Sequence, residues 1–154
     1  MKKTRGVDQA MVKRIAKDIF EVVPMLRKRL FRLDSVQAEH GIPLSHVQVL
    51  AMLSQQTSMS VSEISRKLGI AKPNITPLVD RLISVGLVNR LRDNEDRRVV
   101  NVVILEAGRA KLKAIQESIC EQVEDWGESI SSDDFAKLAD ALSTITRIMG
   151  EVQK

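Results

Sequence analysis

Three hydrogen-bonding side chains recur at alternate positions in one short stretch of the sequence: Lys72, Asn74 and Thr76. They flank Pro73, and proline is well tolerated at the first position of a helix. The start of a helix attracts negative charge through its free N–H groups and its dipole, so side chains placed there suit contact with phosphates and base edges. The same residues also fit an ordinary exposed helix start, and their types do not say which bases they would read.

A helix-turn-helix pattern would position these side chains. Ser60 and Glu63 have the spacing of a capping box, so a first helix should begin there. Gly69 is suited to end it, and a second helix should run from Pro73 to Gly86. Apolar residues at three- and four-residue steps give each helix one face for burial: Val61, Ile64 and Leu68 in the first, and Ile75, Leu78, Val79, Leu82 and Ile83 in the second.

A two-stranded hairpin with a charged tip is predicted after the second helix. Residues 87–92 and 98–105 have strand character, and the second run is rich in β-branched valine and isoleucine. Between them lies Asp93-Asn94-Glu95-Asp96-Arg97, which has the residue types of a turn. The predicted fold class is therefore mainly α with a small β-wing, a winged helix-turn-helix flanked by longer helices.

Residues 79–100, VDRLISVGLVNRLRDNEDRRVV, resemble the MarR family of winged-helix transcriptional regulators. The matching motifs are an Asp-Arg-Leu late in the second helix with a following Gly-Leu-Val, at residues 80–82 and 86–88, and an Asp-Arg-Arg near the wing tip, at residues 96–98. Length and helix order extend the resemblance over most of the chain. It implies a sequence-specific DNA-binding regulator, which we expect to be a repressor. The second helix of such a regulator enters a major groove while the wing reaches a minor groove.

The resemblance also suggests what single residues do. It implies that Arg98 works at the wing, held by Asp80 or Asp96, with Arg97 at the tip as a second contact to phosphate or the minor groove. The serines of the first helix could donate to phosphate or serve only capping and surface polarity, and Arg81 and Arg90 could touch phosphate or be surface charges. The predicted DNA-binding set is Ser62, Ser65, Lys72, Asn74, Thr76, Arg81, Arg90, Arg97 and Arg98, with Asp80 and Asp96 positioning the wing.

Long amphipathic helices are predicted on both sides of the winged region. Apolar residues recur at helical steps between residues 7 and 39, where Pro24 should kink or split the helix, and again over residues 112–126 and 135–148, the last helix starting at the Ser132-Asp133-Asp134 cap. A winged helix buries its own core, so these faces need each other or another chain. The resemblance implies a homodimer through N- and C-terminal dimerisation helices, with residues 1–40, 41–105 and 106–154 as dimerisation, DNA-binding and dimerisation regions. Two recognition helices about 34 Å apart then predict a pseudo-palindromic, inverted-repeat operator on double-stranded DNA.

One junction departs from the family pattern. The usual Leu-Thr-x-x-Gly after the second wing strand is here Leu105-Glu106-Ala107-Gly108, one residue shorter and without the threonine that caps the next helix. We expect the passage from strand to helix to differ locally.

The charge is uneven along the chain. The net charge is +4, but residues 1–33 carry +7 and residues 106–154 carry −4, which fits a protein with one face toward a polyanion. No apolar run is long enough to span a membrane, and no apolar signal core follows the basic N-terminus. The single cysteine fits a reducing compartment, so we expect a cytoplasmic protein.

The sequence gives weaker indications of an effector pocket, a redox-sensing cysteine, a metal site or a catalytic site. The cluster of Arg27, Arg29 and Arg32 could line a pocket for a small anionic or aromatic effector, as in family members, or be a solvated face. Cys120 could sense an oxidant, but its position late in the chain favours a buried, inert thiol. Two histidines are too few for a metal site, and no phosphate loop or catalytic set is present, so neither a cofactor nor an enzyme is predicted. The alternative function is a winged-helix protein-interaction module without specific DNA binding.

Overall fold

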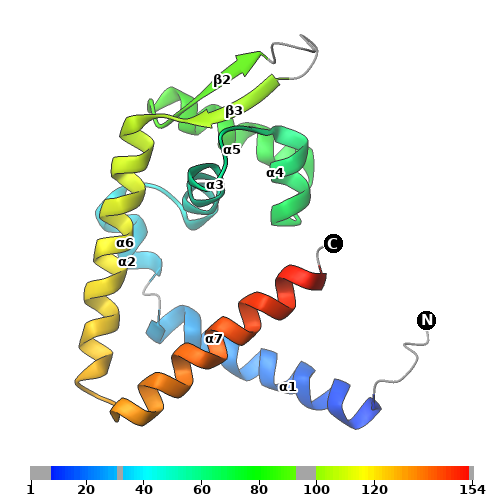
Figure 1. The fold of residues 1–154 in the computed structure, drawn as a ribbon, viewed down its shortest axis with the longest axis vertical. Helices are drawn as coiled ribbons and strands as arrows, with labels where there is room; N and C mark the ends of the chain where they lie inside the picture. Colours follow the sequence, from blue (N-terminus) through cyan, green and yellow to red (C-terminus); the bar gives the residue numbers. More distant parts are fainter. Residues whose placement is uncertain (1–7, 31–32, 93–99, 153–154) are drawn as a thin grey trace.

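The computed structural model describes residues 8–30, 33–92 and 100–152 of the chain (Figure 1). In chain order the elements are α1 (Gln9–Met25), the π-helix η1 (Leu26–Leu30), α2 (Leu33–His40), α3 (Leu44–Ser54), β1 (Met59–Ser60), α4 (Val61–Leu68), α5 (Lys72–Ser84), β2 (Val88–Arg92), β3 (Val100–Ile104), α6 (Glu106–Gly127) and α7 (Ser132–Val152). A winged region of three short helices and a sheet lies at one end, two helical arms lie at the other, and α6 runs between them. The predicted fold class is confirmed. Within the described ranges, no helix is both long and apolar enough to cross a membrane.

The hydrophobic core belongs to the winged region. Among the described residues, every buried hydrophobic side chain lies between Ile42 and Ile115. The core joins α3, both helices of the helix-turn-helix, the sheet and the first half of α6; its fully buried side chains include Val49, Leu50, Ile64, Ile75, Val79, Leu82, Val102 and Ile115. The apolar faces predicted for the two helices of the motif are confirmed, because Ile64, Val79 and Leu82 are among these residues.

The sheet has three antiparallel strands in the order β1-β3-β2, so the predicted two-stranded hairpin is incomplete. The missed strand is Met59–Ser60, which pairs with Val102 and Asn101 of β3. Two residues give no alternating pattern, and Ser60 reads as a helix cap, so the sequence carries no strand signal there. Met59 is 3% exposed and ties the start of α4 to the sheet.

The predicted N-terminal helix is divided near Pro24, as expected. α1 ends at Met25, and the π-helical turn of η1 follows. Proline has no N–H to donate to the carbonyl four residues earlier, and its ring crowds that carbonyl, so a change of helical pitch is favoured nearby.

β3 passes into α6 without a side-chain cap, at the junction where the sequence departs from the family pattern. Leu105 stands at the N-cap position, and its N–H donates to the carbonyl oxygen of Leu87 at 3.0 Å. Gly108 lies against the same carbonyl, so closely that a Cβ atom would collide with it. Backbone contacts to the turn before β2 therefore fix the position of this junction, which has no side-chain cap.

Cys120 is exposed on α6, so the expectation of a buried thiol is wrong. The buried side of α6 is set by Leu112 and Ile115, which pack into the core. Cys120 comes five positions after Ile115, which is about 140° around a helix that turns by about 100° per residue. The late position of a cysteine in the chain says nothing about the helix face that it occupies.

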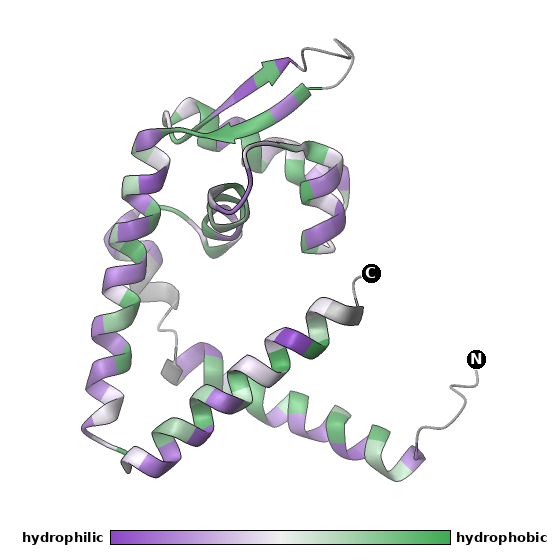
Figure 2. Ribbon diagram, viewed as in Figure 1, coloured by the Kyte–Doolittle hydropathy of each residue, from purple (hydrophilic) through white to green (hydrophobic). Residues whose placement is uncertain are grey.

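The arms α1 and α7 expose apolar faces, visible as green residues along both helices in Figure 2. No side chain of α1 is buried, and its apolar stripe of Met11, Ile15, Ile19 and Val22 is 45–56% exposed. On α7, Leu142, Ile145, Ile148 and Met149 are 37–54% exposed.

The cap of α7 is one residue earlier than predicted. The N–H of Asp134 donates to Oγ of Ser131 at 3.1 Å, so Ser131 takes the role expected of Ser132. Asp133 and Asp134 still lie in the first turn, where the helix dipole favours negative charge.

Candidate nucleic-acid interface

The start of α4 is fixed by the predicted capping box. Oγ of Ser60 accepts from the N–H of Glu63 at 3.2 Å, and the Glu63 carboxylate accepts from the Ser60 N–H at 2.7 Å. Oγ of Ser60 also donates to the Glu63 carboxylate at 2.9 Å, and the hydrogen bonds that the carboxylate accepts from the Ser60 backbone and side chain lower the pKa of Glu63. With the cap satisfied inside the chain, Ser62 in the first turn is exposed and available to a partner.

The start of α5 carries Lys72, Asn74 and Thr76, the three hydrogen-bonding residues predicted to contact DNA. Lys72 and Asn74 are exposed, whereas Thr76 is half-buried and donates from Oγ1 to the Lys72 carbonyl at 3.3 Å. Ile75 between them is fully buried, which fixes the rotation of the helix about its axis. Asn74 lies about 100° around the helix from Ile75, and Lys72 is exposed because it is the first residue of the helix.

A polar hollow of about 470 Å³ lies where the starts of the two helices meet the wing. It is lined by Ser60, Val61, Ser62, Lys72, Thr76, Arg90 and Val100. Four predicted DNA-binding residues, from α4, α5 and β2, are thus brought together around one space: Ser62, Lys72, Thr76 and Arg90. The hydroxyl of Ser62, the ammonium of Lys72 and the guanidinium of Arg90 around one space make a surface suited to phosphate oxygens.

An ion pair connects the recognition helix to the wing. Nη2 of Arg90 on β2 lies 2.7 Å from Oδ1 of Asp80 on α5, with the two side chains 40% and 52% exposed. The family resemblance predicted that Asp80 or Asp96 would hold Arg98, whereas the described partner of Asp80 is Arg90. The pairing of Asp80 with Arg90 joins residues ten positions apart on different elements, and no local spacing rule points to it.

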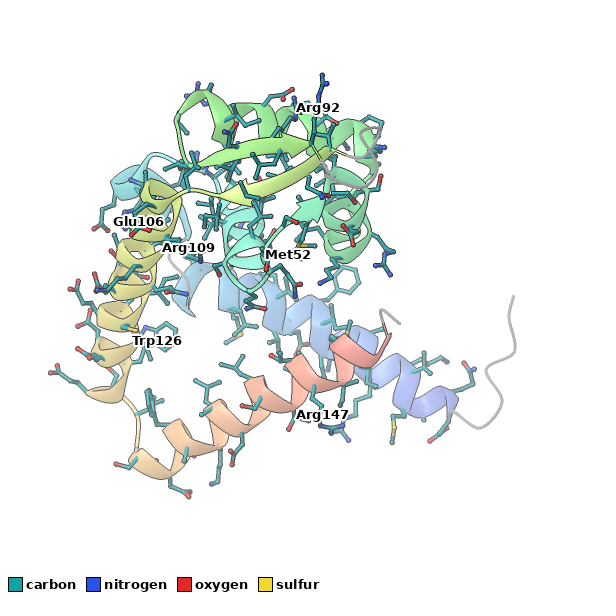
Figure 3. All side chains as sticks on the ribbon, turned by 45° about the horizontal axis from the view of Figure 1, so that its top comes forward. Met52, Arg92, Glu106, Arg109, Trp126 and Arg147 are labelled. Atoms are coloured by element: carbon teal, nitrogen blue, oxygen red, sulfur yellow. The ribbon has the colours of Figure 1, made fainter. Side chains whose placement is uncertain are left out.

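The wing tip lies outside the described residues. Asp96, Arg97 and Arg98, and with them the expected contact between Arg98 and an acidic neighbour, fall in residues 93–99. The last described residue of β2 is Arg92, an exposed basic residue that the sequence argument passed over; Figure 3 shows it at the outer end of the strand. It shares the face of β2 with Arg90, since side chains two apart on a strand point the same way. The alternation Arg90-Leu91-Arg92 in the sequence could have indicated that Arg92 lies on the same face as Arg90.

Ser65 has a different use from the one predicted. Its Oγ donates to the carbonyl oxygen of Ile70 at 2.7 Å, across the turn between α4 and α5. A hydroxyl has one proton to donate, so Ser65 holds the turn and has no second proton for a phosphate.

A buried histidine lies behind the recognition helix. His46 on α3 is 8% exposed, and Oγ of Ser45 is 3.4 Å from its Nδ1. Burial lowers the pKa of the His46 ring, and the charge of Arg81 on α5 lowers it further. Arg81, one of the predicted phosphate contacts, is exposed in the last turn of α5, away from the polar hollow.

We expect the free energy of unfolding to fall as the pH drops below about 6.5, the ordinary value for histidine. In that range the unfolded chain takes up a proton at His46 that the folded domain resists, so acid favours unfolding. Urea unfolding of the wild type and of His46→Gln at pH 7.5 and pH 5.5 checks this. The idea fails if His46→Gln loses as much stability on acidification as the wild type.

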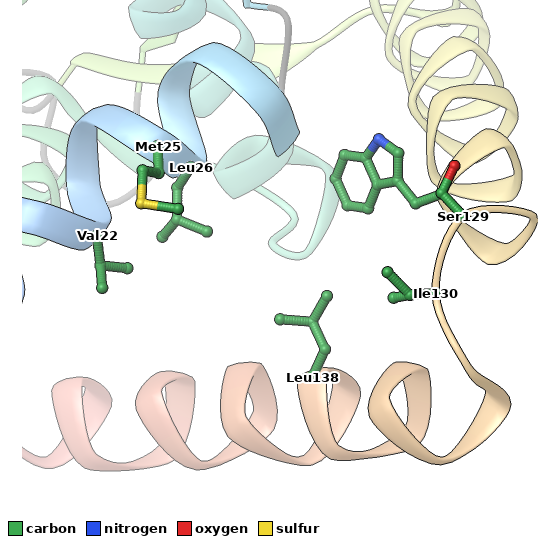
Figure 4. Close-up of a pocket in the computed structure, with 7 residues that line it drawn as sticks. Val22, Met25, Leu26, Ser129, Ile130 and Leu138 are labelled. Carbon is green, nitrogen blue, oxygen red and sulfur yellow. The ribbon is translucent and has the colours of Figure 1, made fainter.

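The basic cluster proposed to bind an effector is only partly described. Arg27 is exposed, while the side chains of Arg29 and Arg32 lie outside the described set. The hollow next to this segment is about 340 Å³ and is lined by Val22, Met25, Leu26, Trp126, Ser129, Ile130 and Leu138, drawn in Figure 4. Among the described residues its lining carries no basic side chain, so this space suits an apolar group.

Comparisons with known proteins agree with this geometry. Residues 42–100 match the model of the MarR family. The chain is 28% identical over 111 residues to the uncharacterised HTH-type transcriptional regulator YfiV of Bacillus subtilis, covering 72% of this chain and 69% of that protein. It is 27% identical to the HTH-type transcriptional regulator TcaR of Staphylococcus aureus, covering 73% of this chain and 76% of that protein.

Solved structures share the fold. RV1404 from Mycobacterium tuberculosis superposes with a TM-score of 0.79 at 20% identity, over 94% of this chain and 97% of that one. The relatives are named as regulators of transcription and not as enzymes, and the matched segment contains the helix-turn-helix and the described strand β2 that line the polar hollow. Over residues 42–100 the chain is therefore similar to the MarR family, and over most of its length it shares the fold of solved structures such as RV1404.

Proposed function

We propose that the protein is a cytoplasmic homodimeric repressor that binds an inverted-repeat operator and leaves it in response to a small molecule or an oxidant. The observation that carries the proposal is the polar hollow, where Ser62, Lys72, Thr76 and Arg90 gather beside the exposed start of α5. In this arrangement α5 would lie in a major groove with Asn74 near base edges, and the hollow would receive the phosphate backbone. Arg97 and Arg98, positioned by Asp96, would extend the contact toward a minor groove.

The arms supply the support for a dimer. Both α1 and α7 carry apolar faces that this chain leaves exposed, and Trp126 at the end of α6 lines the hollow between them (Figure 3). Monomeric proteins rarely leave contiguous apolar surface of this kind uncovered. A second copy would cover it with the same elements, so residues 1–40 and 106–154 would form the dimer and residues 41–105 would bind DNA.

Placing a carboxylate on the α1 stripe should break the dimer. We expect Ile19→Glu to weaken dimerisation at least about tenfold, since central apolar residues of an interface contribute most of its binding energy. Lys13→Glu puts the same carboxylate on another side of α1 and should leave the dimer intact. Sedimentation equilibrium over a range of concentrations distinguishes the two. Equal dissociation constants for Ile19→Glu and wild type would remove α1 from the interface.

The effector is proposed to bind near the end of α1. The apolar hollow would take the aromatic part of a ligand, and Arg27, which follows the lining residue Leu26, would approach its anionic group together with Arg29 and Arg32. One structural neighbour, CouR from Rhodococcus jostii RHA1, is bound to p-coumaroyl-CoA, which is a precedent for ligands on this fold. Trp126 is the single tryptophan of the chain, so its fluorescence would report an occupant directly.

Selection from random duplex DNA, followed by sequencing of the retained fraction, tests the function. Enrichment of an inverted repeat with half-sites about one helical turn apart supports the dimeric regulator. Weak binding that falls steeply with salt and enriches no sequence would favour the alternative, a winged helix whose partner is a protein.

A further inference from the structure

The winged region is joined to the arms by two short stretches of chain. Residues 41–43 lead from α2 into α3, and Leu105 leads from β3 into α6. α2 packs against α6 beside the first of these connections. Gly41 there has φ +71°, and Ile42 is 8% exposed within the core, so the connection is short and anchored. The contact between α2 and α6 therefore helps to decide how the winged region is oriented toward the arms.

Three polar side chains interact at this contact between α2 and α6. Nε2 of His40, at the end of α2, lies 2.9 Å from Oγ of Ser118 on α6. The same Oγ lies 3.1 Å from Oε1 of Glu39, and the His40 ring nitrogen is 3.7 Å from that carboxylate oxygen. The His40 side chain is 9% exposed and that of Glu39 is 58% exposed, so the cluster runs from the protein interior to its surface.

The protons of the cluster can be assigned by counting. A serine hydroxyl has one proton, and Ser118 donates it to Glu39. The short approach of His40 must then be an Nε2–H that donates to Ser118 Oγ. Each group has one role, and the cluster connects residues 78 and 79 positions apart in the chain.

We propose that His40, Glu39 and Ser118 are positioning residues for operator recognition: they fix the angle between the winged region and the arms, and so the half-site spacing that the dimer accepts. This inference rests on the proposed function, because a spacing exists only for a dimer on an inverted repeat. In such a dimer the two recognition helices are held apart by α6 and its contacts. One added base pair moves two half-sites about 3.4 Å apart and turns one relative to the other by about 35°, so a rigid joint rejects it.

The test is a set of operators that carry the selected half-sites with spacers lengthened or shortened by one or two base pairs. The full chain is titrated onto each duplex, and the ratio of the Kd at the wrong spacing to the Kd at the right one is taken. The wild type should show a sharp preference. Ser118→Ala should reduce that ratio by about five- to tenfold, the factor expected from losing one hydrogen bond of ordinary strength. Ser118→Thr, which keeps the hydroxyl, should restore it.

Ser54→Ala is the matched control, because Ser54 is also half-buried but its hydroxyl donates only to Ala51 in its own helix. A merely structural loss at Ser118 would weaken binding at every spacing alike and would leave the spacing ratio unchanged. An unchanged spacing ratio in Ser118→Ala, with a sharp preference in the wild type, overturns the joint and leaves the proposed function standing. A wild type without any preferred spacing overturns the proposed function and the joint with it.

Discussion

Arg90→Ala is expected to weaken operator binding at least about tenfold while leaving the domain folded. Arg90 lines the polar hollow and also pairs with Asp80 at 2.7 Å, so its loss would remove the cation proposed to face phosphate and one contact between β2 and α5. The pair is too exposed to add much to folding, since ion pairs of this kind contribute about 0–1 kcal/mol. Titration of operator DNA over a range of salt concentrations measures the effect, and the slope of log K against log salt should fall by about one.

Asp80→Ala separates the two roles of Arg90. It breaks the same ion pair but leaves the guanidinium, so specific affinity should fall while the salt slope is kept. Arg14→Ala is the matched control, because Arg14 is an exposed arginine that forms an i,i+4 pair on α1, far along the chain from the wing. If Arg90→Ala binds the operator as tightly as Arg14→Ala at moderate salt, the hollow is not where DNA binds.

Gly108→Ala is expected to destabilise the winged region by about 2–4 kcal/mol, although alanine normally favours a helix. A Cβ at this position would collide with the backbone oxygen of Leu87 and come within 2.8 Å of Ile104 Cγ1. Neither the turn nor the strand can retreat freely, since Leu105 also donates to that Leu87 oxygen. Overpacking against backbone forces a shift of the whole junction.

Gly127→Ala supplies the comparison at the other end of α6. Apart from the adjoining backbone of its own helix, no described residue has an atom within 4 Å of a Cβ built there, so this variant should melt with the wild type or slightly above it. Thermal and urea unfolding of the two variants side by side gives the answer. Equal midpoints would mean that the junction between β3 and α6 is looser than these contacts imply.

Local rules predicted the local parts of this structure. The capping box at Ser60 and Glu63, the end of α4 at Gly69 and the break after Pro24 each depend on residues a few positions apart, and each was confirmed. The resemblance, based on residues 79–100, predicted the two described strands of the wing and falls within the segment that matches the MarR family model. These signals survive because the competing arrangements would leave helix ends unsatisfied or apolar faces exposed.

The features that could not be predicted from the sequence depend on contacts between residues that are distant in the chain. The strand Met59–Ser60 exists because β3 lies beside it, and the partner of Asp80 is chosen by how α5 crosses the sheet. Cys120 is exposed because of the face of α6 on which it lies. Ser65 shows the same limit on a smaller scale, since only the folded turn reveals that its hydroxyl already donates to Ile70.

The winged region has a buried core, whereas the arms α1 and α7 expose apolar faces. This difference makes the stability of the protein depend on its concentration. All buried hydrophobic side chains in the described residues lie between Ile42 and Ile115, so the winged region has a core of its own, whereas α1 and α7 would gain most of their hydrophobic stabilisation from the second copy of the proposed dimer. Folding of the arms is then linked to association, and their stability rises with the logarithm of the protein concentration. In a cell that makes little of this protein, the winged region would be folded while the arms α1 and α7 would be unstable, and proteases would degrade the arms. The regulator would thereby act as a gauge of its own abundance, and a modest change in its synthesis would give a steeper change in the number of operators that it occupies.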